Sequence, residues 1–281
     1  MPVHERVPPA LVAFSPAGDA LFTVDNAASK SVTIRTWDPL TGRLRAEMGF
    51  DEPVTCLMPS GREEAFVGSF RGSIAHVGVD ACHIMRRFEL VPGPIRALFF
   101  EPLYPHQLLV RPLWGEVLRV DLDSLAARCL DRPPKLVTVT GSTLATLDVF
   151  GDLTLRPLGA IARVFTLPLP VASAHFVLGA DDRALVVVDA LGSCFRVSVD
   201  DGGVRGRRLW HGKRRVVGIE PQADVVITRR HGRTEVCSLH DGSVFAAYRD
   251  HLTTSASRNG TLALGWRSGR VDIVQTRSAD E

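Results

Sequence analysis

Histidine and cysteine, the residues that most often bind metals, are scattered along the chain. None of the nine histidines stands in a His-x-Glu-x-His or comparable ligand spacing, and the five cysteines include no close pair. A zinc site needs paired ligands at short spacing, and an odd number of widely separated cysteines argues against a disulfide framework. The sequence therefore predicts neither a metal site nor disulfides, and it indicates a reducing compartment.

Motifs for covalent catalysis and for phosphate binding are incomplete. Gly68-Ser69 and Gly141-Ser142 lack the Gly-x-Ser-x-Gly pattern of a nucleophile elbow. The glycine-rich residues 202–206 are not followed by Lys-Ser or Lys-Thr, and they fall between predicted strands rather than before a helix. We therefore predict that the protein is not an enzyme and takes no cofactor and no small-molecule substrate.

Charged residues show one regional concentration, at residues 205–233. Nine basic residues stand there against Glu220 and Asp224, which gives the region a charge of +7. The basic residues are Arg205, Arg207, Arg208, Lys213, Arg214, Arg215, Arg229, Arg230 and Arg233. Two interpretations remain open: a patch that binds RNA or an acidic protein surface, or a by-product of a composition with 30 arginines and 3 lysines. Trp210 is the one aromatic residue of the region, which disfavours recognition of single strands by base stacking.

A second candidate for interaction is the segment 99–106, Phe-Phe-Glu-Pro-Leu-Tyr-Pro-His, which is rich in aromatic residues for a turn between two strands. Phe100 and Tyr104 either fold back on the domain or present an apolar anchor to a protein partner. Leu113 and Trp114 are expected to pack with this turn.

The elements that position these residues follow a repeat marked by glycine. Six glycines recur at intervals of 43, 36, 41, 40 and 37 residues: Gly72, Gly115, Gly151, Gly192, Gly232 and Gly269. Upstream of each lies an apolar run such as Leu108-Leu109-Val110, which is typical of a strand buried on both faces. A second strand with partial alternation follows each glycine. The glycine is therefore predicted to supply a positive φ in a hairpin turn.

Two further strands complete each unit. Short segments such as 54–57 precede the buried run, and more polar segments such as 83–88 come last. Four strands graded from apolar to polar are typical of a propeller blade. The predicted units, within a single domain over residues 1–281, are 10–50, 51–91, 92–132, 133–170, 171–212, 213–250 and 251–281. The last unit lacks one strand, and we expect residues 2–8 to supply it and close the ring.

The first unit resembles a repeat of the WD40 family. Its residues are Phe-Ser-Pro-Ala-Gly-Asp at 14–19, then Trp37-Asp38 and Thr41-Gly42. WD40 repeats of about 40–45 residues carry four strands and contain a Trp-Asp pair. Later units keep an acidic residue in that slot without the tryptophan, as in Val120-Asp121 and His240-Asp241. The resemblance implies a propeller that binds proteins or peptides, and structural roles for Trp37 and Asp38.

The sequence as a whole predicts an all-β, seven-bladed β-propeller of four-stranded antiparallel blades. We expect a non-catalytic protein-interaction scaffold within a larger multiprotein complex. The alternative is an RNA-associated component of a ribonucleoprotein or RNA-processing assembly that uses residues 205–233. No membrane partner is expected, because no window approaches about 18 consecutive apolar residues. The first residues show no basic region followed by an apolar run, so an intracellular location, cytoplasmic or nuclear, is expected.

Removal of residues 1–9 is predicted to lower the melting temperature by many degrees. Without the closing strand, the ring would be left with unpaired sheet edges. Thermal unfolding followed by circular dichroism measures the shift. A truncated protein that melts at the temperature of the full chain would show that the ring closes elsewhere.

Overall fold

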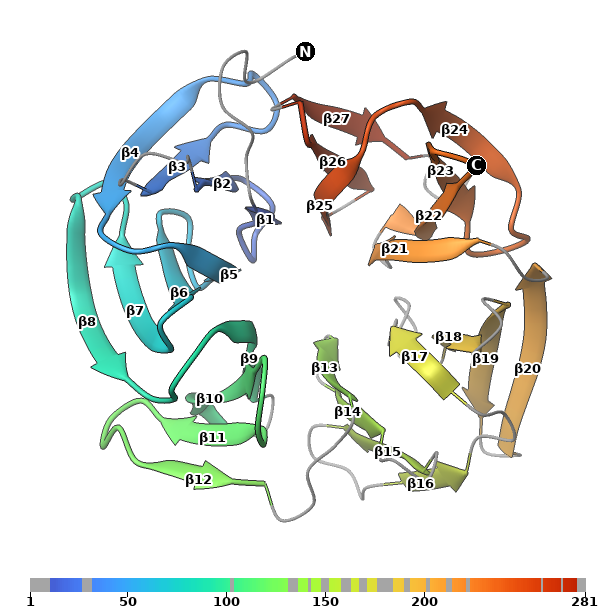
Figure 1. Ribbon diagram of the computed structural model, residues 1–281, viewed down its shortest axis with the longest axis horizontal. Coiled ribbons are helices and arrows are strands. Elements are labelled where there is room, and N and C mark those ends of the chain that lie inside the picture. Colours follow the sequence, from blue (N-terminus) through green and yellow to red (C-terminus); the bar gives the residue numbers. More distant parts are fainter. Residues whose placement is uncertain are drawn as a thin grey trace.

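Seven antiparallel sheets surround a common axis in the computed structural model of the protein (Figure 1). The structure describes residues 11–26, 32–101, 104–130, 136–140, 143–147, 152–157, 163–166, 171–175, 184–189, 193–200, 203–210, 214–220, 223–258, 260–268 and 270–276. Within these residues six sheets have four strands and one has three. The predicted all-β propeller is confirmed. In this part of the chain no helix has the length and the apolar character needed to cross a lipid bilayer.

The blades follow the chain in order, and the strands of each blade follow one another in sequence. Blade 1 holds β1 (Leu11–Phe14), β2 (Leu21–Asp25), β3 (Val32–Trp37) and β4 (Leu44–Phe50). Blade 2 holds β5 (Val54–Pro59), β6 (Glu64–Ser69), β7 (Ser73–Gly78) and β8 (His83–Glu89). Blade 3 holds β9 (Ile95–Glu101), β10 (Tyr104–Pro112), β11 (Leu118–Asp121) and β12 (Ala127–Cys129).

The remaining four blades continue around the ring. Blade 4 holds β13 (Leu136–Thr140), β14 (Thr143–Leu147), β15 (Asp152–Pro157) and β16 (Arg163–Thr166). Blade 5 holds β17 (Val171–His175), β18 (Ala184–Asp189), β19 (Cys194–Asp200) and β20 (Gly203–Trp210). Blade 6 holds β21 (Arg215–Glu220), β22 (Val225–Arg230), β23 (Arg233–Ser238) and β24 (Val244–Tyr248). Blade 7 holds β25 (Leu252–Arg258), β26 (Thr261–Trp266) and β27 (Val271–Gln275).

Burial within a blade falls from the second strand outward. Every residue of β2 is buried, and β6 is buried except at Glu64. The outer strand β8 has no buried residue. The second strands are apolar on both faces because each lies between two neighbouring blades, whereas the fourth strand forms the outer rim (Figure 1).

Three of the six repeating glycines lie in described hairpin turns and have a positive φ. The φ angles of Gly72, Gly115 and Gly232 are +96°, +102° and +76°. These residues join the second strand to the third in blades 2, 3 and 6. Gly151, Gly192 and Gly269 lie outside the described residues.

Trp37 and Asp38 both make hydrogen bonds within blade 1. The indole Nε1 of Trp37 donates to Oγ1 of Thr23 at 2.8 Å. The carboxylate of Asp38 accepts from two amides of the following turn, at 2.9 and 3.0 Å, and pairs with Arg45 at 2.9 Å. The hydrogen bond from Arg45 is the main cause that lowers the pKa of Asp38 from 3.8 to about 2. The two residues thus fix the buried strand pair and the β3–β4 turn.

In blade 6 the acidic residue lies elsewhere than predicted. The amide and the carbonyl of Asp38 both make hydrogen bonds across the β3–β4 turn. Ser238 makes the equivalent bonds in blade 6. Its amide donates to the carbonyl of Ser243 at 2.8 Å, and its carbonyl accepts from the amide of Gly242 at 3.0 Å. His240-Asp241 lies within the turn, so its placement in the Trp-Asp slot is wrong. Ser238 occupies the position that Asp38 has in blade 1. Asp241 lies within the turn, where its carboxylate accepts a hydrogen bond from the amide of Ser243 at 2.9 Å.

Blade 7 packs directly on blade 1. The amide of Val12 donates to Oγ1 of Thr254 at 3.2 Å. Val12 and Leu21 share a buried apolar cluster with Ala263 and Val271. The first and last blades are therefore in contact through their inner strands. Residues 2–8, predicted to supply the fourth strand of blade 7, lie outside the described residues.

Gly72→Ala is predicted to destabilise the fold more than Gly232→Ala does. At both positions alanine must adopt a positive φ. A Cβ at Gly72 would also overlap the carbonyl oxygen of Val91, whereas a Cβ at Gly232 meets no atom within 4 Å. We expect the free energy of unfolding to fall by about 3 kcal/mol for Gly72→Ala and by about 1 kcal/mol for Gly232→Ala, as measured by urea denaturation. Equal losses would contradict the close approach of the Gly72 turn to residue 91.

Candidate functional site

Each blade presents two ends to solvent. Because the strands alternate in direction, the connection that enters a blade and the turn between its second and third strands lie at the same end. We call this end of the ring the linker face. Among the described residues it carries the connections 51–53, 90–94 and 249–251 and the turns 70–72, 113–117 and 231–232. The opposite face carries turns such as 15–20 and 38–43.

The predicted basic residues divide between the rim and the linker face. Arg207 and Arg208 are exposed on β20, the outer strand of blade 5, and as strand neighbours they point to opposite faces of the sheet. On the linker face of blade 6, Arg215 is paired in register with Arg229, and Arg230 with Arg233. Arg205 also belongs to β20, but its side chain and the turn around Gly212 lie outside the described part of the chain.

Two arginines of this region are engaged inside the fold. The guanidinium of Arg214 lies 5.6 Å from the ring centroid of Trp210, and its Nε lies 3.5 Å from the carboxylate of Glu235. Arg229 contacts His251 at the edge of blade 7, with 2.5 Å between Nη2 and Nε2. Glu235 lies two residues beyond the segment 205–233, so its negative charge is not included in the +7 of that segment. One positive charge of the segment, that of Arg214, is therefore paired within the fold.

Phe100 and Tyr104 lie on strands rather than in a long turn, since β9 ends at Glu101 and β10 begins at Tyr104. Phe100 packs edge to face on Phe66, with ring centroids 5.6 Å apart, in the core between blades 2 and 3. Tyr104 is half exposed, and the guanidinium of Arg119 lies 5.7 Å from its ring centroid. Phe100 is thus partly buried against the core, and Tyr104 is the more exposed of the two.

Leu113 and Trp114 lie at the far end of β10 from Tyr104, so the expected packing against residues 99–106 is wrong. The nine residues of β10 separate its two ends by about 30 Å. Trp114 instead covers the backbone of Gly93, where a Cβ would lie 3.3 Å from two indole carbons.

Three exposed apolar side chains lie on the linker face of blades 2 and 3. Phe70, Leu113 and Trp114 have exposed fractions of 57%, 43% and 69%. We call these three residues the blade 2–3 patch. The sequence carried a signal for them, because Phe70 and Trp114 stand just before the turn glycines Gly72 and Gly115. Turn positions of this kind are usually filled by small or polar residues.

The two turns that carry the patch are joined by main-chain hydrogen bonds. The carbonyl of Gly72 accepts from the amides of residues 90 and 91, at 3.2 and 3.4 Å. The amide of Leu113 donates to the carbonyl of Pro94 at 2.8 Å. The connection 90–94 thus links the turn of Phe70 to the turn of Trp114. The backbone therefore fixes the positions of the two turns that carry the patch.

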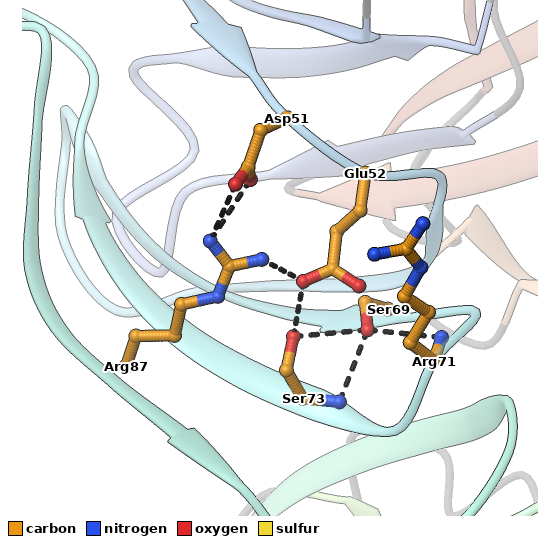
Figure 2. Close-up of polar contacts among 6 residues, drawn as sticks. All are labelled: Asp51, Glu52, Ser69, Arg71, Ser73 and Arg87. Atoms are coloured by element: carbon orange, nitrogen blue, oxygen red, sulfur yellow. Dashed lines mark hydrogen bonds and ion pairs between the residues drawn. The ribbon is translucent and has the colours of Figure 1, made fainter.

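A network around the buried carboxylate of Glu52 supports the turn that carries Phe70 (Figure 2). Glu52, which is 4% exposed, accepts a hydrogen bond from Oγ of Ser73 at 2.5 Å. The two hydroxyls of Ser69 and Ser73 lie 2.9 Å apart, and Oγ of Ser69 accepts from the amide of Ser73 at 3.0 Å. Arg87 of β8 pairs with Glu52 and, at 2.8 Å, with Asp51. Its hydrogen bond to Asp51 lowers the pKa of that carboxyl.

This network ties three separate segments together. Glu52 belongs to the connection between blades 1 and 2, Ser69 and Ser73 flank the turn of Phe70, and Arg87 belongs to the outer strand of blade 2 (Figure 2). Oε1 of Glu52 receives the contacts from both Arg87 and Ser73, and Oε2 has no hydrogen-bond partner among the described residues. The orientation of the turn therefore depends on the connection that enters blade 2 and on the outer strand of that blade.

The described residues include no cluster of metal-binding side chains. Among them no group of three or more His, Cys, Asp or Glu side chains could hold a metal ion. His76 stacks on Phe66 with ring centroids 4.3 Å apart, and burial lowers its pKa. Burial raises the pKa of the thiols of Cys56 and Cys194 to about 12. Cys56 and Cys194 belong to the buried core, whereas His76 is partly exposed and lies 3.5 Å from the carboxylate of Glu64.

Comparison with solved structures supports the fold. The chain is similar to the crystal structure of the Myceliophteria thermophila Cps50 (Swd1) beta-propeller domain, with 13% sequence identity and a TM-score of 0.74. The alignment covers 99% of this chain and 98% of that chain. No family model and no curated protein matches the sequence. At this identity the likeness shows the shared fold alone.

Arg87→Met is predicted to destabilise the protein much more than Arg62→Met. Arg87 pairs with the buried Glu52, whereas Arg62 pairs at 3.3 Å with Asp19, and both members of that second pair are exposed. Loss of the cation beside a buried carboxylate costs about 3 kcal/mol, and an exposed pair contributes about 0.5 kcal/mol. Urea denaturation of each variant measures the difference.

A second substitution, at Glu52, tests whether its unpaired charge causes the loss of stability in Arg87→Met. Glu52→Gln in the Arg87→Met background removes the uncompensated charge and should restore part of the lost stability. A double variant less stable than Arg87→Met would show that the buried charge of Glu52 is not the cause.

Proposed function

We propose that the protein is a non-catalytic scaffold that binds a protein partner through the blade 2–3 patch, as one subunit of a larger multiprotein complex. The observation that carries this proposal is the exposure of Phe70, Leu113 and Trp114 on one surface joined by main-chain hydrogen bonds. Exposed aromatic side chains gathered on one surface are typical of a surface that another molecule covers.

The composition of the patch and its surroundings fits a protein ligand. Tryptophan and other aromatic residues supply a large share of the binding free energy at protein interfaces. Exposed polar residues, Arg71 and Glu116, stand beside the three apolar side chains in the same turns. An apolar centre with a polar rim is the usual plan of an interface between proteins.

The rigid support of the patch favours binding without rearrangement. The turn of Phe70 is fixed by Ser69 and by the buried Glu52, and that of Trp114 by the bond from Leu113 to Pro94. A surface that is already ordered loses less conformational entropy when it binds a partner. This supports a role as a fixed docking surface.

The alternative, an RNA-associated component, is favoured by exposed arginines on the linker face of blade 6. Arg215, Arg230 and Arg233 have exposed side chains there. Trp210, the one aromatic residue of the segment, is half buried under the guanidinium of Arg214. Stacking of bases on aromatic rings strengthens the binding of single strands, and this segment offers no exposed aromatic ring for it. We therefore place the RNA role second.

Trp114→Ala combined with Phe70→Ala is predicted to release the partner without unfolding the protein. Both side chains are mostly exposed, so their removal changes the core little. The full chain, carrying an affinity tag, is captured gently from cells that express it, and the recovered proteins are quantified. We expect at least one protein in near-stoichiometric amount with the wild type, and a loss of about tenfold or more with the double variant.

Leu40→Ala supplies the matched control. Leu40 is 88% exposed and belongs to the 38–43 turn on the opposite face. This variant should recover the partner as the wild type does. Recovery that is unchanged in the double variant, or absent with the wild type, would contradict the proposal.

A further inference from the structure

A cleft of about 590 Å³ lies between blades 3 and 4. Its walls are the outer strands β11 and β12 of blade 3 and the middle strands β14 and β15 of blade 4. Three arginines line it, Arg119 and Arg128 from blade 3 and Arg156 from blade 4. Leu130 and Leu144 supply apolar lining, and both belong to the apolar cluster at the junction of the two blades.

Strand register explains why these side chains share the cleft. Arg119 is paired in register with Arg128 on β11 and β12, so both project from the same face of blade 3. On blade 4, Leu144 is paired with Arg156, and Thr146 with Thr154. Positions two apart on a strand share a face, so the two threonines project on the side of Arg156.

One of the three arginines is already neutralised. Arg119 makes two hydrogen bonds to the buried carboxylate of Glu101, at 2.6 and 2.9 Å. Arg128 and Arg156 are exposed, and among the described residues neither has a hydrogen bond or an ion pair. Two guanidinium groups are thus left to act on a ligand.

We propose that this cleft binds the phosphate group of a phosphoserine or phosphothreonine side chain in a partner protein. A phosphomonoester carries a charge of about −1.5 to −2 and three acceptor oxygens. Arg128 and Arg156 match that charge, and the hydroxyls of Thr146 and Thr154 add donors from the same face. Guanidinium groups bind phosphate oxygens through paired, charge-assisted hydrogen bonds.

The lining of the cleft favours a peptide over a nucleic acid. No aromatic ring is among the described residues that line it, so a nucleobase has no surface on which to stack. Leu130 and Leu144 instead offer an apolar surface to a side chain next to the phosphorylated residue. The volume suits one modified side chain with its neighbours.

The phosphopeptide site rests on the proposed function only in that its ligand is a protein. It uses blade 3 residues other than those of the blade 2–3 patch. Trp114→Ala therefore separates the two proposals, because it removes a patch residue and leaves the cleft lining unchanged.

The test is a binding assay with peptides. Labelled full-length protein is applied to an immobilised library with a central phosphoserine and degenerate flanking residues, and to the same library with serine. The dissociation constant of the best phosphopeptide is then measured by fluorescence anisotropy. We expect binding to the phosphorylated library only, and affinities about tenfold or more weaker for Arg128→Gln and for Arg156→Gln.

Two variants and one other probe decide the outcome. Arg233→Gln, at an exposed arginine of blade 6, and Trp114→Ala should bind the phosphopeptide as the wild type does. Equal binding to both libraries, or unchanged affinity in both cleft variants, would overturn the proposal. A single-stranded RNA that binds the cleft in place of the phosphopeptide, and is lost in the same two variants, would overturn it too. If phosphopeptides fail to bind while the patch variants still lose their partner, the cleft proposal alone fails.

Discussion

The packing of each blade between its two neighbours is the interaction on which the rest of the structure depends. Phe22 of blade 1 shares a buried cluster with Val67 of blade 2, and Ile74 of blade 2 shares another with Leu108 of blade 3. A single four-stranded sheet with apolar residues on both faces cannot bury them alone. The blades are therefore stable as a ring.

The features that we connect with binding lie at junctions between blades. The patch depends on the connection 90–94 between blades 2 and 3, and the cleft lined by Arg128 and Arg156 lies between blades 3 and 4. The network of Glu52 and Arg87 joins the connection that enters blade 2 to the outer strand of that blade and supports the turn of Phe70. Blade 3 thus contributes to two separate surfaces. Substitutions in the buried network are expected to act on binding through the geometry of a turn.

Much of the fold could be predicted from the sequence, because its signals are local and repeated. Apolar runs mark the second strands, and Gly72, Gly115 and Gly232 mark hairpin turns that need a positive φ. The surfaces were harder to predict, since they join residues from different blades. Arg128 and Arg156 are 28 positions apart and meet only because their blades are neighbours. Arg214 belonged to a basic segment in the sequence, yet it pairs with Glu235 inside the fold.

Site-specific photocrosslinking within the intact complex tests the central claim most directly. A photoreactive amino acid replaces Trp114 on the linker face or, in a second protein, Leu40 on the opposite face, and both positions are exposed. Illumination before purification then records which position touches another protein. The account predicts a defined crosslinked protein from position 114 and none from position 40. Crosslinks from position 40 with none from position 114 would contradict the assignment of the binding surface to the linker face.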